Sequence, residues 1–151
     1  MSHCMRKGKR REEGFTLIEL VIVMAIMAIL VVIAIPSYIT ARQSATISAS
    51  KSNLRNLAMA LRLYTAENNL NVYPPETGTG GINDVLPTYL PGGAPKNPAG
   101  KNYVYAQTGM PAGASFLIGD PDNYGGDYYA VGPAGSIQIL TDPVSGTDIT
   151  W

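Results

Sequence analysis

The chain has 151 residues, of which 46% are hydrophobic, and its formal net charge is zero, with one cysteine (Cys4) and one histidine (His3). From Phe15 onward there is neither Cys nor His, which excludes a disulfide, a cysteine nucleophile, a His/Cys zinc site and a histidine general base from that part of the chain. Five of the eleven basic residues precede Gly14, and the residues after Gly14 carry a net charge of −3, so nucleic acid is not an expected partner.

An apolar run follows residues 1–14, which contain five basic side chains. Leu20–Ile35 contains no polar side chain, and Phe15–Ile35 spans 21 residues with Glu19 as its one charged group. A helix of that length is roughly 31 Å long, close to the thickness of a hydrocarbon core. The basic flank predicts that the N-terminus stays in the cytoplasm while the rest is exported. A cleaved secretory signal is the alternative, but such signals have a shorter apolar region and a small-residue cleavage site, which Pro36-Ser37-Tyr38 does not match.

The position of Glu19 requires an explanation, because placing an acidic side chain at membrane depth costs about 2.5–3.5 kcal/mol of free energy. It could lie near one end of the span and reach the interface. Alternatively, cleavage between Gly14 and Phe15 would create a positively charged amine four residues before Glu19, on the same helix face. That amine could pair with Glu19 of the same chain or of a neighbouring copy. Pairing between copies would fix the axial register of helices that are otherwise uniformly apolar.

The basic leader, Gly14, the stretch Phe15-Thr16-Leu17-Ile18-Glu19-Leu20, the apolar helix and Pro36 together resemble the class III signal sequence of the type IV pilin superfamily. The resemblance is close over about residues 8–65. It implies cleavage after Gly14 by a prepilin peptidase and N-methylation of Phe15. It also implies assembly of a helical filament by an inner-membrane platform and an ATPase, with the acid at the place of Glu19 meeting a neighbour's terminal amine. One departure is the acidic pair Glu12-Glu13, where the family usually has basic or neutral residues.

Helical periodicity continues beyond Pro36, which lacks an amide hydrogen and is expected to kink or loosen the helix. We expect one long helix over about residues 16–68, consisting of a transmembrane and filament-core segment (15–36) and an amphipathic stem (37–70). An apolar stripe on the stem is predicted to pack on the protein's own sheet; it consists of Leu54, Leu57, Ala58, Leu61 and Tyr64. A uniformly apolar half-helix must lie in lipid or in a bundle of identical helices, which is the physical argument for polymerisation.

The remaining residues predict a small head, so that the fold class is α+β. Residues 71–101 are rich in Gly and Pro and read as a structured loop with one helical turn near Ile82–Leu86. Residues 102–151 contain short β-branched and aromatic runs separated by turn formers, which predict an antiparallel sheet of three or four strands. The runs are Asn102–Gln107, Ser115–Gly119, Asp127–Gly132 and Ser136–Leu140.

Two acidic stretches of the head are candidate sites. Asp120 and Asp122 fit turn chemistry, with acid–base chemistry as the alternative. Asp142 and Asp148 flank a Gly-containing loop that could hold calcium. That loop resembles the calcium-binding C-terminal loop of the major pseudopilin of type II secretion, as does the segment with Pro98, Gly100, Tyr103 and Tyr105; Asn97 and Ala99 depart from the family pattern.

The sequence therefore predicts a structural filament subunit with no catalytic residue and no cofactor other than a possible calcium ion. We expect a single-pass precursor in the inner membrane and then a periplasmic or extracellular filament, either a type IV pilus or a type II secretion pseudopilus. The alternatives are a minor pilin that primes or tips a filament, and a membrane-anchored binding domain or hydrolase that uses the acids near Asp120 and Asp122.

Overall fold

The computed structural model describes residues 14–109 and 113–150, so the leader before Gly14 and the terminal Trp151 lie outside the described residues. The chain divides after Ala41 into two compact units, which are considered separately below. We call residues 42–151 the head.

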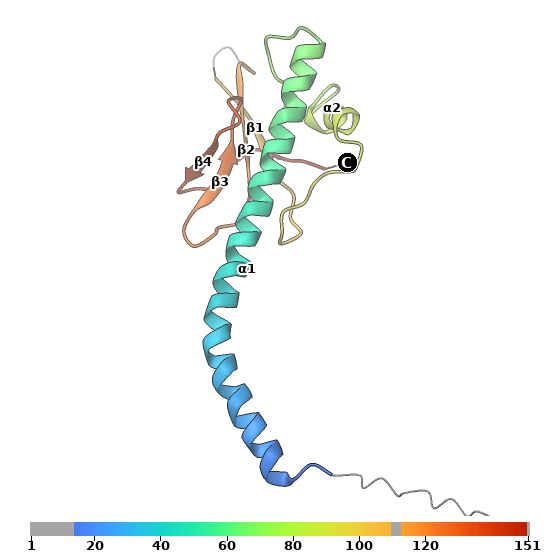
Figure 1. The fold of residues 1–151 in the computed structure, drawn as a ribbon. Helices are drawn as coiled ribbons and strands as arrows, with labels where there is room; N and C mark the ends of the chain where they lie inside the picture. The colour runs from blue at the N-terminus through green and yellow to red at the C-terminus, as the bar shows by residue number, and fades with distance from the viewer. Residues whose placement is uncertain (1–13, 110–112, 151) are drawn as a thin grey trace, which may run out of the picture. The chain divides into compact units, whose positions relative to one another are not determined.

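A single helix, α1, covers Leu17–Glu67 (Figure 1) and confirms the long helix expected from the periodicity. In the first unit its side chains are exposed and mostly apolar, and its most apolar 18-residue window has a mean hydropathy of 3.2. By length and composition, α1 is the one helix among the described residues that could cross a membrane. The helix runs through Pro36, whose carbonyl accepts a hydrogen bond of 3.2 Å from the Thr40 hydroxyl. The kink at Pro36 remains a prediction.

The head contains an antiparallel sheet with strand order β4-β3-β2-β1-β5. Its strands are β1 Val104–Thr108, β2 Ser115–Gly119, β3 Tyr128–Val131, β4 Ile137–Leu140 and β5 Thr147–Asp148. β2, β3 and β4 lie within predicted runs, and β1 extends one residue beyond its run, to Thr108. The neighbouring strands β1 and β2 and then β3 and β4 pair along their whole lengths. The two-residue β5 pairs with β1 and was not predicted. The α+β fold class is thereby confirmed.

The head's core lies between the sheet and the second half of α1. Leu54, Leu57, Ala58 and Leu61 of the predicted stripe are at most 1% exposed and join Tyr105 and other sheet residues in one cluster, while Tyr64 is half-buried. Burying a large apolar side chain contributes about 1.5–3 kcal/mol relative to leaving it exposed. Apolar burial, rather than intrinsic helix propensity, therefore fixes this part of α1 on the sheet.

The expected helical turn near Ile82–Leu86 is part of a longer helix, α2, which covers Ile82–Tyr89 and includes Pro87. Ile82 and Leu86 are fully buried, and the Ile82 amide donates to the Pro75 carbonyl at 2.9 Å. The prediction of a single turn was therefore too short.

Noncovalent contacts hold the C-terminal segment. Ile149 is fully buried, and its amide donates to the Tyr103 carbonyl at 2.8 Å. From α2, the Asn83 side-chain amide donates to the Asp148 carbonyl at 3.1 Å, and its oxygen accepts from the Thr150 amide at 2.9 Å. A side chain at Gly146 would collide with the Tyr105 carbonyl, so glycine permits this close approach to β1.

Candidate functional site

The start of α1 is a capping box in which Thr16 and Glu19 satisfy each other's polar groups. A Glu19 carboxylate oxygen accepts hydrogen bonds from the amide and the hydroxyl of Thr16, both at 2.8 Å, and the Glu19 amide donates to that hydroxyl at 3.3 Å. The spacing Thr-x-x-Glu is readable in the sequence, but our sequence analysis did not use it. Glu19 is therefore held in the first turn of α1 rather than in the middle of the apolar segment.

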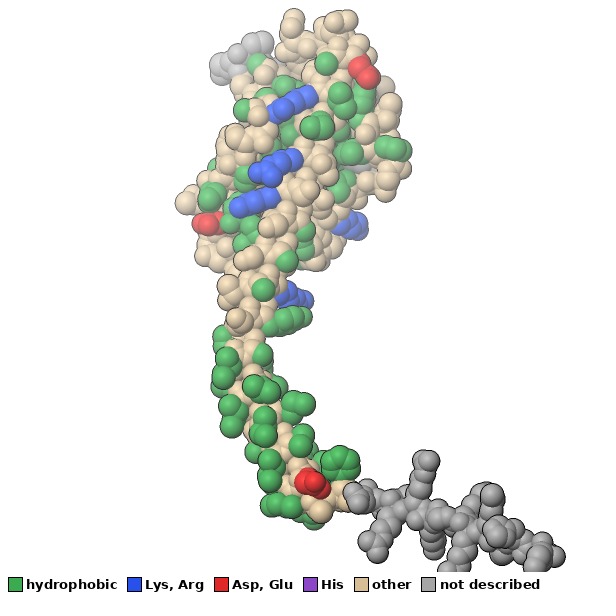
Figure 2. All heavy atoms as spheres, viewed as in Figure 1, with side chains coloured by type: hydrophobic (Ala, Val, Ile, Leu, Met, Phe, Trp, Pro, Cys, Tyr) green, Lys and Arg blue, Asp and Glu red, His purple; other side chains and the backbone are tan. Residues whose placement is uncertain are grey.

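The predicted cleavage residues lie at the same place. Gly14 and Phe15 line one shallow depression together with Thr16 and Glu19, and the Phe15 side chain is 89% exposed. Figure 2 shows an acidic side chain at the start of an otherwise apolar surface. Thus the structure brings Gly14, Phe15 and Glu19 together, while cleavage, methylation and charge pairing remain predictions.

Asp120 is a buried polar centre of the head. Its side chain is 1% exposed and accepts hydrogen bonds from Ser50 of α1, from Asn97 at 2.8 Å and from the Tyr124 hydroxyl at 2.8 Å. The Asp122 amide also donates to it, at 3.0 Å. Burial and the hydrogen bond to the Asp120 carboxylate both raise the pKa of Tyr124 above its ordinary value.

Asp122 lies beside this centre and is paired with Lys101. Partial burial alone would raise the pKa of Asp122, but hydrogen bonds from Lys101 and Asn97 outweigh it and lower that pKa below its ordinary value. Correspondingly, the hydrogen bond to Asp122 raises the pKa of Lys101. Both acids therefore have donors within the head, as expected for a structural network.

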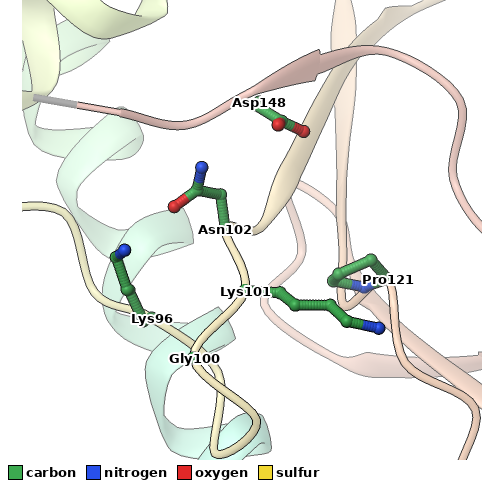
Figure 3. Close-up of a pocket in the computed structure, with 6 residues that line it drawn as sticks. All are labelled: Lys96, Gly100, Lys101, Asn102, Pro121 and Asp148. Atoms are coloured by element: carbon green, nitrogen blue, oxygen red, sulfur yellow. The ribbon is translucent and has the colours of Figure 1, made fainter.

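Of the two residues expected to hold calcium, Asp148 alone lines the cleft drawn in Figure 3. Asp148 lines a cleft of about 310 Å³ together with Lys96, Lys101 and Asn102 (Figure 3), whereas Asp142 does not line that cleft. The Asp142 carboxylate accepts a hydrogen bond of 3.3 Å from the neighbouring Thr141 hydroxyl. Among the described residues no three acidic, histidine or cysteine side chains are grouped to hold a metal. The calcium site stays a prediction.

Comparison with known proteins gives a match to one family and matches to individual proteins. The family described as the prokaryotic N-terminal methylation motif matches residues 9–35. Type II secretion system core protein G of Pectobacterium carotovorum is 28% identical over 83% of this chain and 78% of its own length, and the Pseudomonas aeruginosa protein of the same name is 32% identical over 40% of this chain. The type IV major pilin protein PilA of Myxococcus xanthus is 46% identical over 38% of this chain.

The lengths matched differ between these relatives. The chain covers 42% of the P. aeruginosa protein and 26% of the M. xanthus pilin. The methylation motif, the long helix that begins at Leu17, the small antiparallel sheet and these relatives together support the type IV pilin superfamily, which includes type IV pilins and type II secretion pseudopilins.

Proposed function

We propose that the chain is a structural subunit that polymerises into a type IV pilus-like filament after cleavage at Gly14–Phe15 and N-methylation of Phe15. The observation that carries this proposal is the position of Glu19, in the first turn of an exposed apolar helix and next to the proposed cleavage bond. Cleavage puts an ammonium group one residue before Thr16. Glu19 of a neighbouring copy then supplies the opposite charge when apolar helices pack side by side.

The direction of assembly must come from outside the chain. Lipid tails are as apolar as neighbouring helices, so transfer of α1 from bilayer to filament gains little from the hydrophobic effect. Helix packing and the pairing of Glu19 supply specificity, and an ATPase with an inner-membrane platform supplies the work. The partners that this proposal requires are therefore copies of the chain, a prepilin peptidase that also methylates, and that assembly machinery.

We also propose that the chain is not an enzyme. The hydrolase alternative needs a free carboxylate at Asp120 or Asp122, but Asp120 accepts four hydrogen bonds and Asp122 is paired with Lys101. The proposed location is the inner membrane for the precursor and the periplasm or the cell exterior for the filament. The relatives include both type II secretion and type IV pilus proteins, so the proposal covers either kind of filament.

The test replaces Glu19 by Ala or Gln in the full chain. We expect filaments in the sheared cell fraction to be lost, while the subunit still inserts in the membrane and loses its leader. Glu67→Gln is the matched control, because Glu67 is also an α1 glutamate and should leave filaments unchanged. Mass spectrometry of native subunits should show an N-terminal methylated Phe15. Normal filaments from Glu19→Ala, or an intact Gly14–Phe15 bond in the native subunit, would contradict the proposal.

A further inference from the structure

In the head, α1 carries a row of basic side chains along one side. Lys51, Arg55 and Arg62 are four and seven residues apart, so they fall within an arc of about 40° on a helix of 3.6 residues per turn. Figure 2 shows basic side chains in a row over this part of the chain, with acidic ones only at the margins of that face. The row places three positive charges on one side of α1.

The row has no acidic partner in the described part of the chain, where the one ion pair is Lys101–Asp122. The Lys51 ammonium instead lies 4.3 Å from the centroid of the Tyr129 ring. Two guanidinium nitrogens of Arg62, Nε and Nη2, are buried without a hydrogen-bond partner in the described residues. The row therefore carries positive charge that no acid compensates among the described residues, and an outside carboxylate near it would gain charge attraction.

Apolar side chains lie beside this row on the solvent side of α1. Met59 is 61% exposed and Leu63 is 48% exposed. Both line a small groove of about 140 Å³ that Tyr89 and Leu90 close on the other side. We call Lys51, Arg55, Met59, Arg62 and Leu63 together the basic face.

A surface of opposite charge lies at one edge of the sheet. β4 is an edge strand, and its Ile139 side chain is 63% exposed. Because Tyr128 pairs with Leu140, the exposed residues Asp127 and Asp142 lie at the same end of the β3–β4 pair. Neither acid has a salt-bridge partner among the described residues. We call Asp127, Ile139 and Asp142 the acidic edge.

We propose that the basic face of one copy binds the acidic edge of the next copy. This inference rests on the proposed filament function and names the surfaces that join neighbouring heads. Each surface has an exposed apolar residue beside unpaired charges, and the charges have opposite sign. Two basic faces repel each other, as do two acidic edges, so a basic face binds an acidic edge in preference to a copy of itself. A contact between two different surfaces leaves one of each free at the ends, and it generates an open helical polymer when the rotation between copies does not close a ring.

The first experiment uses cysteine crosslinking in filaments. The chain has no cysteine after Cys4, so Met59→Cys and Ile139→Cys introduce single thiols while leaving every charge of both surfaces in place. With both substitutions, a short bismaleimide should give a ladder of crosslinked subunits, while either substitution alone should not give one. Met59→Cys with Val72→Cys is the matched control, because Val72 is an exposed apolar residue (40%) of the same head outside both surfaces. Filaments that form but give no ladder, or an equal ladder with Val72→Cys, overturn the inference.

The second experiment reverses charges. Arg55→Glu alone, or Asp142→Arg alone, should reduce the yield of sheared filaments at least about fivefold, because each places like charges opposite one another. Combining them restores the opposite signs and should restore the yield. Lack of rescue when both variants are stable and membrane-inserted, or full yield from each single variant, contradicts the inference.

The two proposals fail in different ways. If the wild-type chain forms no filaments and keeps its leader, the proposed function is wrong. If wild-type filaments form and depend on Glu19, but neither crosslink nor charge rescue is seen, the filament function stands and the pairing of the basic face with the acidic edge is wrong.

Discussion

Asp120 shows how one residue joins segments that are distant in sequence. Its donors are Ser50, 70 residues before it, Asn97, 23 residues before it, and two residues of its own turn. A buried carboxylate is tolerated only when donors compensate for its lost hydration. Its contribution is therefore to fix α1, the loop with Asn97 and the turn after β2 in one arrangement.

We expect Asp120→Asn to lower the melting temperature of the head by roughly 5–15 °C, since the loss of a charged acceptor that several donors share costs about 1–3 kcal/mol. The exposed acid Asp127 lies in the same connection, so Asp127→Asn is the control and should shift the melting temperature by less than about 2 °C. Thermal unfolding of residues 42–151 followed by circular dichroism measures both. Equal shifts for the two variants would show that the buried network contributes nothing specific.

The sequence analysis could name site residues where the signal was local. Gly14, Phe15 and Glu19 lie within six residues of one another, and the structure places them together. For Asp120 the sequence showed only an acid among turn formers, because its partners Ser50 and Asn97 are brought to it by tertiary packing. Turn chemistry was a correct interpretation of this segment as far as it went, but burial could not be read from it.

Among the elements, α1 was predictable and β5 was not. The continuous apolar run and the apolar stripe that follows it together extend over many residues, so they predict α1 almost to its ends, Leu17 and Glu67. β5 has two residues and no β-branched run, and its place is decided by β1 and by the burial of Ile149. α2 was predicted too short because the Gly- and Pro-rich composition of residues 71–101 indicated a loop, whereas the buried side chains of Ile82 and Leu86 hold a helix that continues through Pro87.

For the stability of the head, whether an apolar side chain of α1 is buried should matter more than which apolar residue it is. Leu57 is fully buried and Met59, two residues away, is 61% exposed. We expect Leu57→Ala to reduce the free energy of unfolding by about 2–5 kcal/mol because it leaves a cavity. Met59→Ala should change it by less than about 0.5 kcal/mol. Urea unfolding of residues 42–151 would test this, and a similar loss for both variants would contradict the packing of α1 described above.

For the loop around β5 we propose that calcium binds through Asp142 and Asp148. Calcium at about 100 times its dissociation constant should then stabilise the head by about 2.7 kcal/mol. Asp142→Ala and Asp148→Ala should abolish this gain, and magnesium should not reproduce it. An unchanged melting temperature with calcium would refute the site. Because Asp142 also belongs to the acidic edge, bound calcium should weaken crosslinking between Met59 and Ile139.

At the scale of the whole molecule, the boundary after Ala41 separates a segment with exposed side chains from the unit that contains the buried core. Before it, the described side chains are exposed and mostly apolar, whereas the core side chains begin with Ser50. The sequence predicted this change from composition alone, since the apolar run ends at Ile35 and the amphipathic stripe begins at Leu54.

We expect residues 42–151 to fold cooperatively in water, because the buried core lies wholly within them. The chain from Phe15 onward should need detergent, since its exposed apolar helix has no soluble partner. Near-UV circular dichroism and sedimentation of the two forms would test this. A head that unfolds without residues 15–41, or a monomeric detergent-free form of the longer chain, would contradict the division.

Ser50 is the first buried residue of α1 in chain order, and its hydroxyl bonds to Asp120. In the filament proposed above, tension carried along α1 would reach the partly buried Ile47 and the Ser50–Asp120 hydrogen bond before it reaches the buried leucines that follow. A stretched fibre would therefore load this first contact region before the apolar core, and the head would peel away from its own helix from that end.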